Sequence, residues 1–197
     1  MWNEEMHRLV LCEAFREPNI GPFAHSFDFL PCQSARIDRQ YLRLSLPEKL
    51  VDYAVCFDLE KGMDGTHTQS SQFSFPDLGA ANRIRDLCRQ MSNPAINHTW
   101  SLMNRPLVLS IETKRPGEGF DKAVLQISAW QTAQWNKLLH LIALTQDKDA
   151  DSLTREDEAD LLRGLSFLPG IIIQGNEWYF VATTREGRTT VSFWHCL

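Results

Sequence analysis

The stretch that decides the fold is Pro106-Leu107-Val108-Leu109-Ser110-Ile111-Glu112-Thr113-Lys114, followed directly by Arg115-Pro116-Gly117. Its apolar and polar side chains alternate, which predicts a β-strand with the odd-numbered apolar residues on one face. Ser110, Glu112 and Lys114 then lie on the other face. Burying a carboxylate and an ammonium beside an apolar strand is costly unless the two are paired with each other or with a cation. Glu112 and Lys114 are therefore candidate functional residues.

A second strand is predicted over residues 50–59, where Asp52 and Asp58 alternate with apolar side chains. If the two strands are neighbours, Asp52 and Glu112 can meet with Lys114 beside them. Two carboxylates form an oxygen-rich pocket that suits Mg²⁺ or Mn²⁺, and a lysine there can orient a water or stabilise charge on a phosphate oxygen. The alternative is a purely structural pair of Glu112 and Lys114, at an exposed strand end or inside the sheet.

A long helix is predicted from about residue 119 to residue 144, directly after this strand. Gln126 and Trp130 are four residues apart, so they share a helical face with Lys122. The glutamine amide can contact a phosphate or a metal-bound water, and the indole can stack on a base. A tryptophan at helical spacing is also typical of a hydrophobic core, and this alternative stays open.

The remaining pattern predicts further helices and strands, and a single domain over residues 1–197. It comprises a helix over 3–16, a strand over 25–30, a helical turn over 36–42, a short helix over 79–91, a helix near 161–162, and strands over 170–174, 177–184 and 189–194. Residues 60–100 are interpreted as an insertion between the two motif strands, because they are too few to bury a core of their own. The fold class is therefore α/β, with a central mixed sheet flanked by helices.

The segment from Asp147 to Glu158 has the acidic spacing of a calcium-binding EF-hand loop. Ser152 stands where that loop needs a glycine, and Thr154 replaces the usual apolar residue. A solvated linker that caps the next helix is the favoured interpretation.

Composition limits the partners and the compartment. The 197 residues have a formal net charge of −5, which argues against broad, non-specific coating of nucleic acid but leaves room for a small basic cleft. No apolar run approaches the ~18 residues of a membrane span, and acids occupy the N-terminus where a signal peptide has bases. Five cysteines without a Cys-x-x-Cys pair fit reduced thiols, so an intracellular protein, cytoplasmic or nuclear, is expected. The terminal strand over 189–194 could pair with another chain, so a homodimer is possible.

The motifs resemble those of the PD-(D/E)XK nuclease superfamily, in its fungal nuclease-like branch. The stretches that carry the resemblance are Val51-Asp52-Tyr53, Ser110-Ile111-Glu112-Thr113-Lys114-Arg115-Pro116-Gly117, Gln126-x-x-x-Trp130, Trp2-Asn3 with His7, Ala35-Arg36-Ile37, Ile96-Asn97-His98-Thr99, Leu168-Pro169-Gly170-Ile171-Ile172 and Trp178-Tyr179-Phe180-Val181-Ala182-Thr183-Thr184. Two features depart from the family pattern. Val51 stands where the family has proline, and the two acids are 112 − 52 = 60 positions apart, so the insertion must loop out for their strands to pair.

The resemblance implies a restriction-endonuclease-like fold and a metal-dependent nuclease, with DNA as the expected substrate and Mg²⁺ or Mn²⁺ as the cofactor. It assigns metal binding to Asp52, Glu112 and the Thr113 carbonyl, catalysis to Asp52, Glu112, Lys114 and Gln126, and substrate contacts to Arg115, Lys122 and Trp130, with Arg83 as a further candidate. Glu4 or Glu5 corresponds to an acid on the first helix of several relatives.

A different class of function remains open beside the nuclease. The acidic total and the lack of a separate DNA-reading element also fit a nuclease fold recruited to another role. That role is either a biosynthetic enzyme that acts on a small molecule in the same cleft, or an interaction module.

Overall fold

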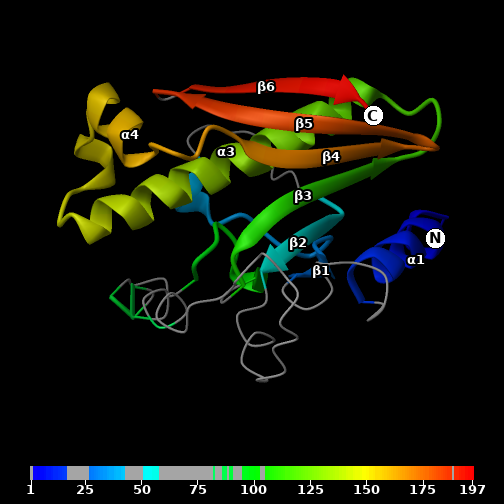
Figure 1. The fold of residues 1–197 in the computed structure, drawn as a ribbon, viewed down its shortest axis with the longest axis horizontal. Coiled ribbons are helices and arrows are strands. Elements are labelled where there is room, and N and C mark those ends of the chain that lie inside the picture. The colour runs from blue at the N-terminus through cyan, green and yellow to red at the C-terminus, as the bar shows by residue number, and fades with distance from the viewer. Residues whose placement is uncertain are drawn as a thin grey trace, which may run out of the picture.

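The structure is a computed structural model that describes residues 2–16, 27–42, 51–57, 95–102, 105–187 and 189–197, together with the isolated positions 82, 86, 87, 89 and 90. Figure 1 shows its helices and strands. These are α1 (Trp2–Arg16), β1 (Phe27–Pro31), the 3₁₀ helix η1 (Arg39–Tyr41), β2 (Tyr53–Phe57), the 3₁₀ helix η3 (Trp100–Leu102), β3 (Leu107–Lys114), α3 (Phe120–Thr145), the 3₁₀ helix η4 (Ala150–Ser152), α4 (Arg155–Leu161), β4 (Leu168–Gln174), β5 (Glu177–Glu186) and β6 (Thr189–Cys196).

The six described strands form one sheet in the order in which they occur along the chain. Neighbouring strands are antiparallel except β3 and β4, which are parallel and connected through α3 and α4. β2 pairs directly with β3, with Tyr53 opposite Ile111, although a long segment separates them in the sequence. The prediction of a mixed sheet in which the two motif strands are neighbours is therefore confirmed.

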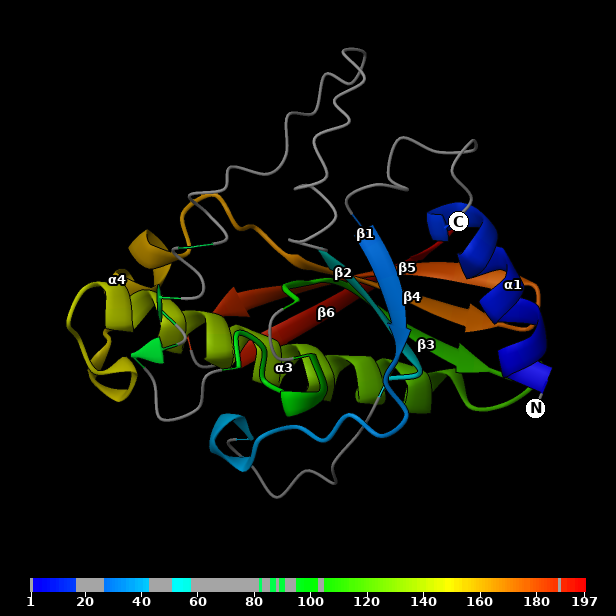
Figure 2. The ribbon, with the colours of Figure 1, turned by 90° about the horizontal axis from the view of Figure 1, so that it is seen from below.

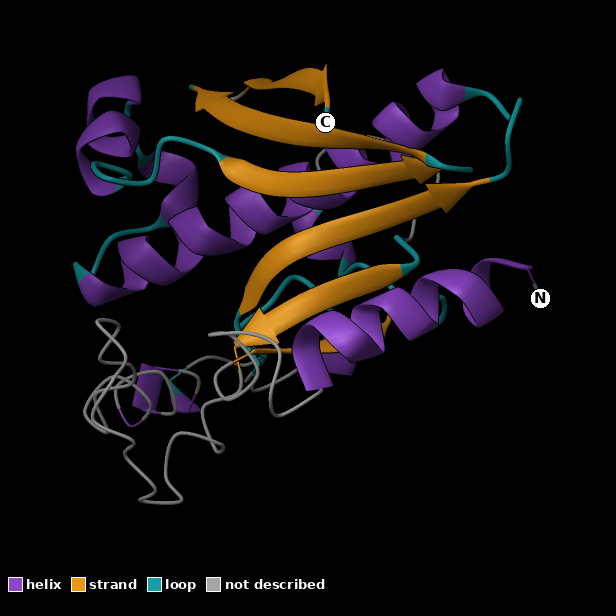
Figure 3. Ribbon diagram, turned by 45° about the vertical axis from the view of Figure 1, so that its right-hand side comes forward, coloured by secondary structure: helices purple, strands orange, loops and turns teal. Residues whose placement is uncertain are grey.

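Helices cover the two faces of the sheet. Figure 2 shows α3 running along one face with α4 beside its C-terminal end, and Figure 3 shows α1 on the opposite face, over β1–β3. Gly170 in β4 lets α3 lie close to the sheet, because a Cβ there would stand only 2.6 Å from Cδ1 of Ile127. No described helix combines the length and the apolar composition that a bilayer span requires.

Two predicted boundaries need correction. β2 begins at Tyr53, so Asp52 lies in a bend just before the strand and not within it. The reason is that the Asp52 amide donates to Ile111 in β3 (3.1 Å) while its carbonyl accepts from Cys32 beyond β1 (2.8 Å), which breaks the strand alternation. Residues 95–99, assigned to the insertion, belong to the core, where Thr99 bridges to Ile37. The predicted helix over 79–91 falls largely outside the described residues.

Prediction agrees with structure for most of the other elements. The helices over 3–16 and 119–144 and the three C-terminal strands are present, each with slightly different ends. Around the acidic segment, Asp149 caps η4, and Thr154 and Asp157 form a capping box at the start of α4. The capping interpretation of this segment is therefore confirmed.

Polar side chains are buried along α3 and connect it to the segments that lead into the sheet. Trp130 is fully buried, with its ring centroid 4.4 Å from that of His98 and the two planes at 81°. Lys137 lies seven residues after Trp130 on α3. Its Nζ donates a hydrogen bond to Oη of Tyr41 in η1 (3.1 Å). Tyr41 Oη also lies 3.0 Å from Nδ1 of His140.

Trp130→Ala is expected to lower the free energy of unfolding by about 3–5 kcal/mol, because it empties a fully buried indole site. Urea denaturation followed by circular dichroism measures the change. Trp100 is 52% exposed, so Trp100→Ala is the matched control and should change stability by less than about 0.5 kcal/mol. A Trp130→Ala protein that keeps wild-type stability would contradict the core assignment.

Candidate active site

The structure brings Asp52 to the end of β3, as the sequence predicts. Oδ2 of Asp52 accepts two hydrogen bonds from Thr113, one from the backbone amide (2.8 Å) and one from Oγ1 (2.6 Å). Asp52 directly precedes Tyr53, which pairs with Ile111, and its charge acts on Glu112, so the two carboxylates lie close together. The Asp52 backbone and side chain are thus both held, and its carboxylate has a defined orientation.

Glu112 is a buried carboxylate that is only partly satisfied. It is 1% exposed, and its Oε1 accepts a hydrogen bond from Nζ of Lys114, whose side chain is 17% exposed. Within the described part of the chain, Oε2 of Glu112 is buried without a hydrogen-bond partner. A buried, unpaired carboxylate oxygen is costly, so this oxygen marks a position where a ligand would be stabilising.

Burial raises the pKa of Glu112 from its ordinary value to about 7, and the negative charge of Asp52 raises it further. The hydrogen bond and the positive charge of Lys114 lower the pKa, as does an interaction with the Asp52 backbone. A carboxyl group with this pKa releases its proton readily when a cation approaches, which is a property of functional sites.

The donor set fits a hard divalent cation. Asp52 and Glu112 supply carboxylate oxygens, one of them unpaired. The Thr113 amide points toward Asp52, and in an extended strand the carbonyl of the same residue points the same way. Among the described residues, no three His, Cys, Asp or Glu side chains are grouped as metal ligands. Mg²⁺ needs only one or two protein carboxylates with waters and phosphate, whereas zinc takes three or four protein ligands.

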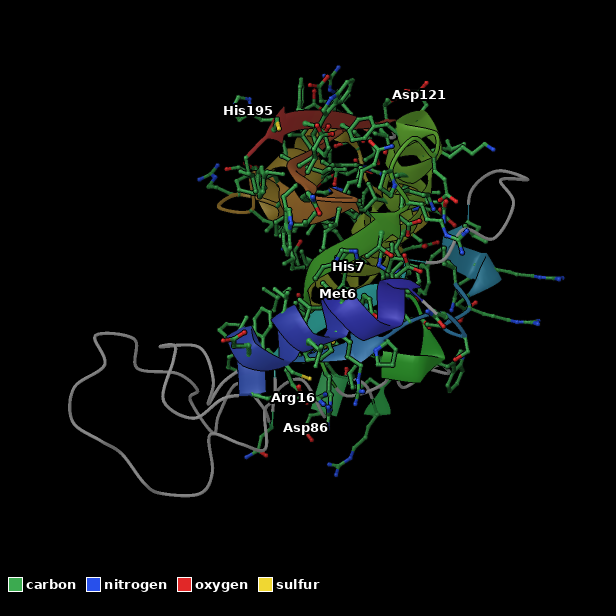
Figure 4. All side chains as sticks on the ribbon, turned by 90° about the vertical axis from the view of Figure 1, so that its right-hand side faces the viewer. Met6, His7, Arg16, Asp86, Asp121 and His195 are labelled. Atoms are coloured by element: carbon green, nitrogen blue, oxygen red, sulfur yellow. The ribbon has the colours of Figure 1, made fainter. Side chains whose placement is uncertain are left out.

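His7 on α1 also lies near Asp52. The sequence pattern assigned it no role. Its side chain is 6% exposed, and burial lowers its pKa while the charge of Asp52 raises it. Figure 4, which labels His7, shows it on the edge of α1 nearest to β3. His7 lies four residues before the buried Leu11, so the helical period was the signal that places it on the inward face of α1.

The predicted substrate-contacting residues divide into two groups. Arg115 and Lys122 are exposed, on either side of the turn that connects β3 to α3. Gln126 is half-buried and lies one helical turn nearer to this end of α3 than Trp130. Trp130 is fully buried against His98, so the structure supports its core alternative and corrects the prediction that it stacks on a base.

Glu4 and Glu5 are on α1, but their side chains are outside the described part, as is the whole of Arg83.

Comparison with known proteins identifies one family. The family model described as the PD-(D/E)XK nuclease superfamily matches residues 1–195, which is nearly the whole chain. Neither a curated protein nor a solved structure matches the chain. The match is to the superfamily as a whole, so the fungal branch stays a prediction.

The raised pKa of Glu112 predicts a pH-dependent effect of Glu112→Gln on stability. Ionising Glu112 in the folded protein costs free energy, so wild type loses stability as the pH rises from about 5 through about 7. Glu112→Gln cannot ionise. Its free energy of unfolding, relative to that of wild type, should therefore rise by up to about 3 kcal/mol between pH 5 and pH 8. Urea denaturation in EDTA at the two pH values measures this.

The exposed residue Glu13 provides the control, because Glu13→Gln should show the same small effect at both pH values. A Glu112→Gln effect that does not change between pH 5 and pH 8 would contradict the assigned environment of Glu112.

Proposed function

The chain belongs to the PD-(D/E)XK nuclease superfamily, and on this premise we propose that it hydrolyses phosphodiester bonds of nucleic acid, DNA in particular, with Mg²⁺ or Mn²⁺. The observation that carries the proposal is the buried carboxylate of Glu112, which lies near Asp52, is paired with the Lys114 ammonium and, among the described residues, keeps one oxygen without a hydrogen-bond partner. A purely structural Glu112–Lys114 pair gives no reason for a second carboxylate at the same point. The metal-dependent site explains all three residues together.

Asp52 and Glu112 would hold the cation, with the Thr113 carbonyl as a further ligand. A cation bound there supplies positive charge to the phosphate and lowers the pKa of a bound water. The hydrogen bonds from Thr113 keep Asp52 in place, so little ordering is needed when the cation arrives.

Lys114 acts on the phosphate. Its ammonium has three donors, of which Glu112 uses one, and its partial exposure leaves the others accessible from solvent. It can therefore donate to a phosphate oxygen or orient the attacking water, and it stabilises the negative charge that develops during hydrolysis. Glu112 keeps the ammonium at the site, because the two groups are paired before substrate binds.

The phosphate backbone would be contacted by Arg115, Lys122 and Gln126. The acidic total does not oppose this arrangement, because the acids are unevenly distributed. Seven of the 25 acidic residues lie between residues 147 and 160. Figure 1 shows α4, in that segment, at the opposite end of α3 from the C-terminal end of β3.

Glu112→Ala and Lys114→Ala are each expected to reduce metal-dependent cleavage of DNA at least about 100-fold, because each removes a group that stabilises the transition state. Release of a fluorescent end label from single- and double-stranded DNA and from RNA, with Mg²⁺ or Mn²⁺, measures the rate. Lys148 is paired with Asp157 far from the site, so Lys148→Ala is the matched control and should retain activity. Full activity in both site variants, with folding verified by circular dichroism, would refute the proposal.

Mn²⁺ affinity is expected to rise about tenfold between pH 6 and pH 8, because protons compete for Glu112 below its pKa of about 7. Isothermal titration calorimetry measures this affinity without substrate. Glu112→Gln should bind more weakly and with little pH dependence. Tight Mn²⁺ binding together with no affinity for any nucleic acid would instead favour the small-molecule enzyme.

A further inference from the structure

The two edges of the sheet differ in how they are protected. β1 has five residues, ends at Pro31, and has Asp28 paired with Arg16 (2.9 Å) and Arg105 (3.8 Å). Charges, proline and short length are the features that prevent an edge strand from pairing with another chain. β6 has eight residues, Thr-Thr-Val-Ser-Phe-Trp-His-Cys, and contains no proline, lysine, arginine, aspartate or glutamate. The β6 edge therefore lacks the protection of the β1 edge.

Within the described part of the chain, the backbone of β6 has N–H and C=O groups along this edge that no neighbouring strand pairs. The Leu197 amide donates to Trp178 in β5 (2.9 Å), so odd-numbered residues direct their N–H and C=O groups toward β5. The groups of Thr190, Ser192, Trp194 and Cys196 then point away from the sheet. Among the described strands, none lies beyond β6, and Figure 1 shows it at the outer edge.

Large apolar side chains accompany these groups. Phe193 and Trp194 are each 56% exposed, and Leu197 is 73% exposed. Phe193 lies on the face opposite α3, because its neighbour Ser192 contacts Ser128 of α3 (2.7 Å between the Oγ atoms). An exposed, uncharged strand edge with apolar side chains is a surface for pairing with another strand.

We propose that a second copy of this chain occupies the edge, with the two β6 strands antiparallel and Phe193 on the twofold axis. In this register Ser192 of each copy lies opposite Trp194 of the other, and Thr190 opposite Cys196. The outward N–H and C=O groups of these four residues are then all hydrogen-bonded. Each of the four residues lies opposite a residue of the other copy whose groups also point outward.

The second copy is the occupant because the edge is complementary to itself. In this isologous contact Phe193 meets its own counterpart and the residues on either side of it meet each other, so a strand with charges of one sign would meet like charge. β6 has no such side chain, although the whole chain has a net charge of −5. The two Phe193 rings lie directly opposite each other, in an aromatic cross-strand pair that is stabilising.

In this dimer the two candidate active sites lie far apart. A twofold axis normal to the sheet leaves both α3 helices on one face and the two β3 strands seven strand spacings apart, about 34 Å. Neither site reaches the other, so each should act independently. One strand pair is a small interface, so the association is expected to be weak and to depend on protein concentration.

Analytical ultracentrifugation of the wild type from about 1 µM to about 500 µM should show a monomer–dimer equilibrium. Phe193→Lys and Phe193→Glu should each be monomeric, because like charges meet on the twofold axis. An equimolar mixture of the two should dimerise again through opposite charges. Leu9, 66% exposed on α1, provides the control, and Leu9→Lys should dimerise like wild type.

Hydrogen exchange gives a second measurement that needs no variant. The amides of Thr190, Ser192, Trp194 and Cys196 should exchange more slowly at high protein concentration. Their exchange rates should fall as the fraction of dimer rises. A wild type that stays monomeric to about 500 µM, a dimer that persists in both charge variants, open-ended oligomers, or concentration-independent exchange would each overturn the proposal. Cleavage per chain should be equal in wild type and Phe193→Lys, so this test and that of the nuclease can fail separately.

Discussion

The site depends on the hydrogen bonds that tie Asp52 to the end of β3. Its carboxylate accepts from the Thr113 amide and hydroxyl, while its own amide and carbonyl are bonded to Ile111 and Cys32. The contacts with Thr113 and Ile111 join residues about sixty positions apart and hold a carboxylate beside a second, buried carboxylate. Burial and then the charge of Asp52 disfavour the ionised form of Glu112, and its raised pKa shows the cost. The surrounding sheet must provide the free energy that keeps them together.

That free energy comes from the packing on both sides of the strands. α3 buries Ile127 and Trp130 against one face, and α1 buries Leu11 against the other. The close approach of α3 at Gly170 and the His98–Trp130 contact connect the helix to β4 and to the segment before β3. The electrostatically costly candidate site thus lies between two packed faces of the sheet, which is the usual relation between active sites and their supporting core.

The sequence was sufficient for the strongly periodic elements and for the faces on which the candidate site residues lie. The alternation of β3 placed Glu112 and Lys114 on one face because side-chain direction in a strand follows from local geometry. Asp52 was found in the same way, although the bend at this residue was not, because it results from hydrogen bonds to β1 and β3 that are distant in sequence. His7 was assigned no role for a related reason. Its proximity to Asp52 arises from how α1 packs on the sheet, and no local pattern records that packing.

Sequence alone determined which groups share a face, since strand and helix periods are properties of the local backbone. It therefore determined the carboxylate–lysine pair, the order of elements and the family resemblance. Tertiary structure decided what each group does there. Within the described part of the chain, it buried Trp130 and residues 95–99 in the core, left one oxygen of Glu112 without a hydrogen-bond partner, and placed β6 at the edge of the sheet. Burial, pKa and strand neighbours depend on segments that meet only when the chain folds, so they cannot be deduced from one segment.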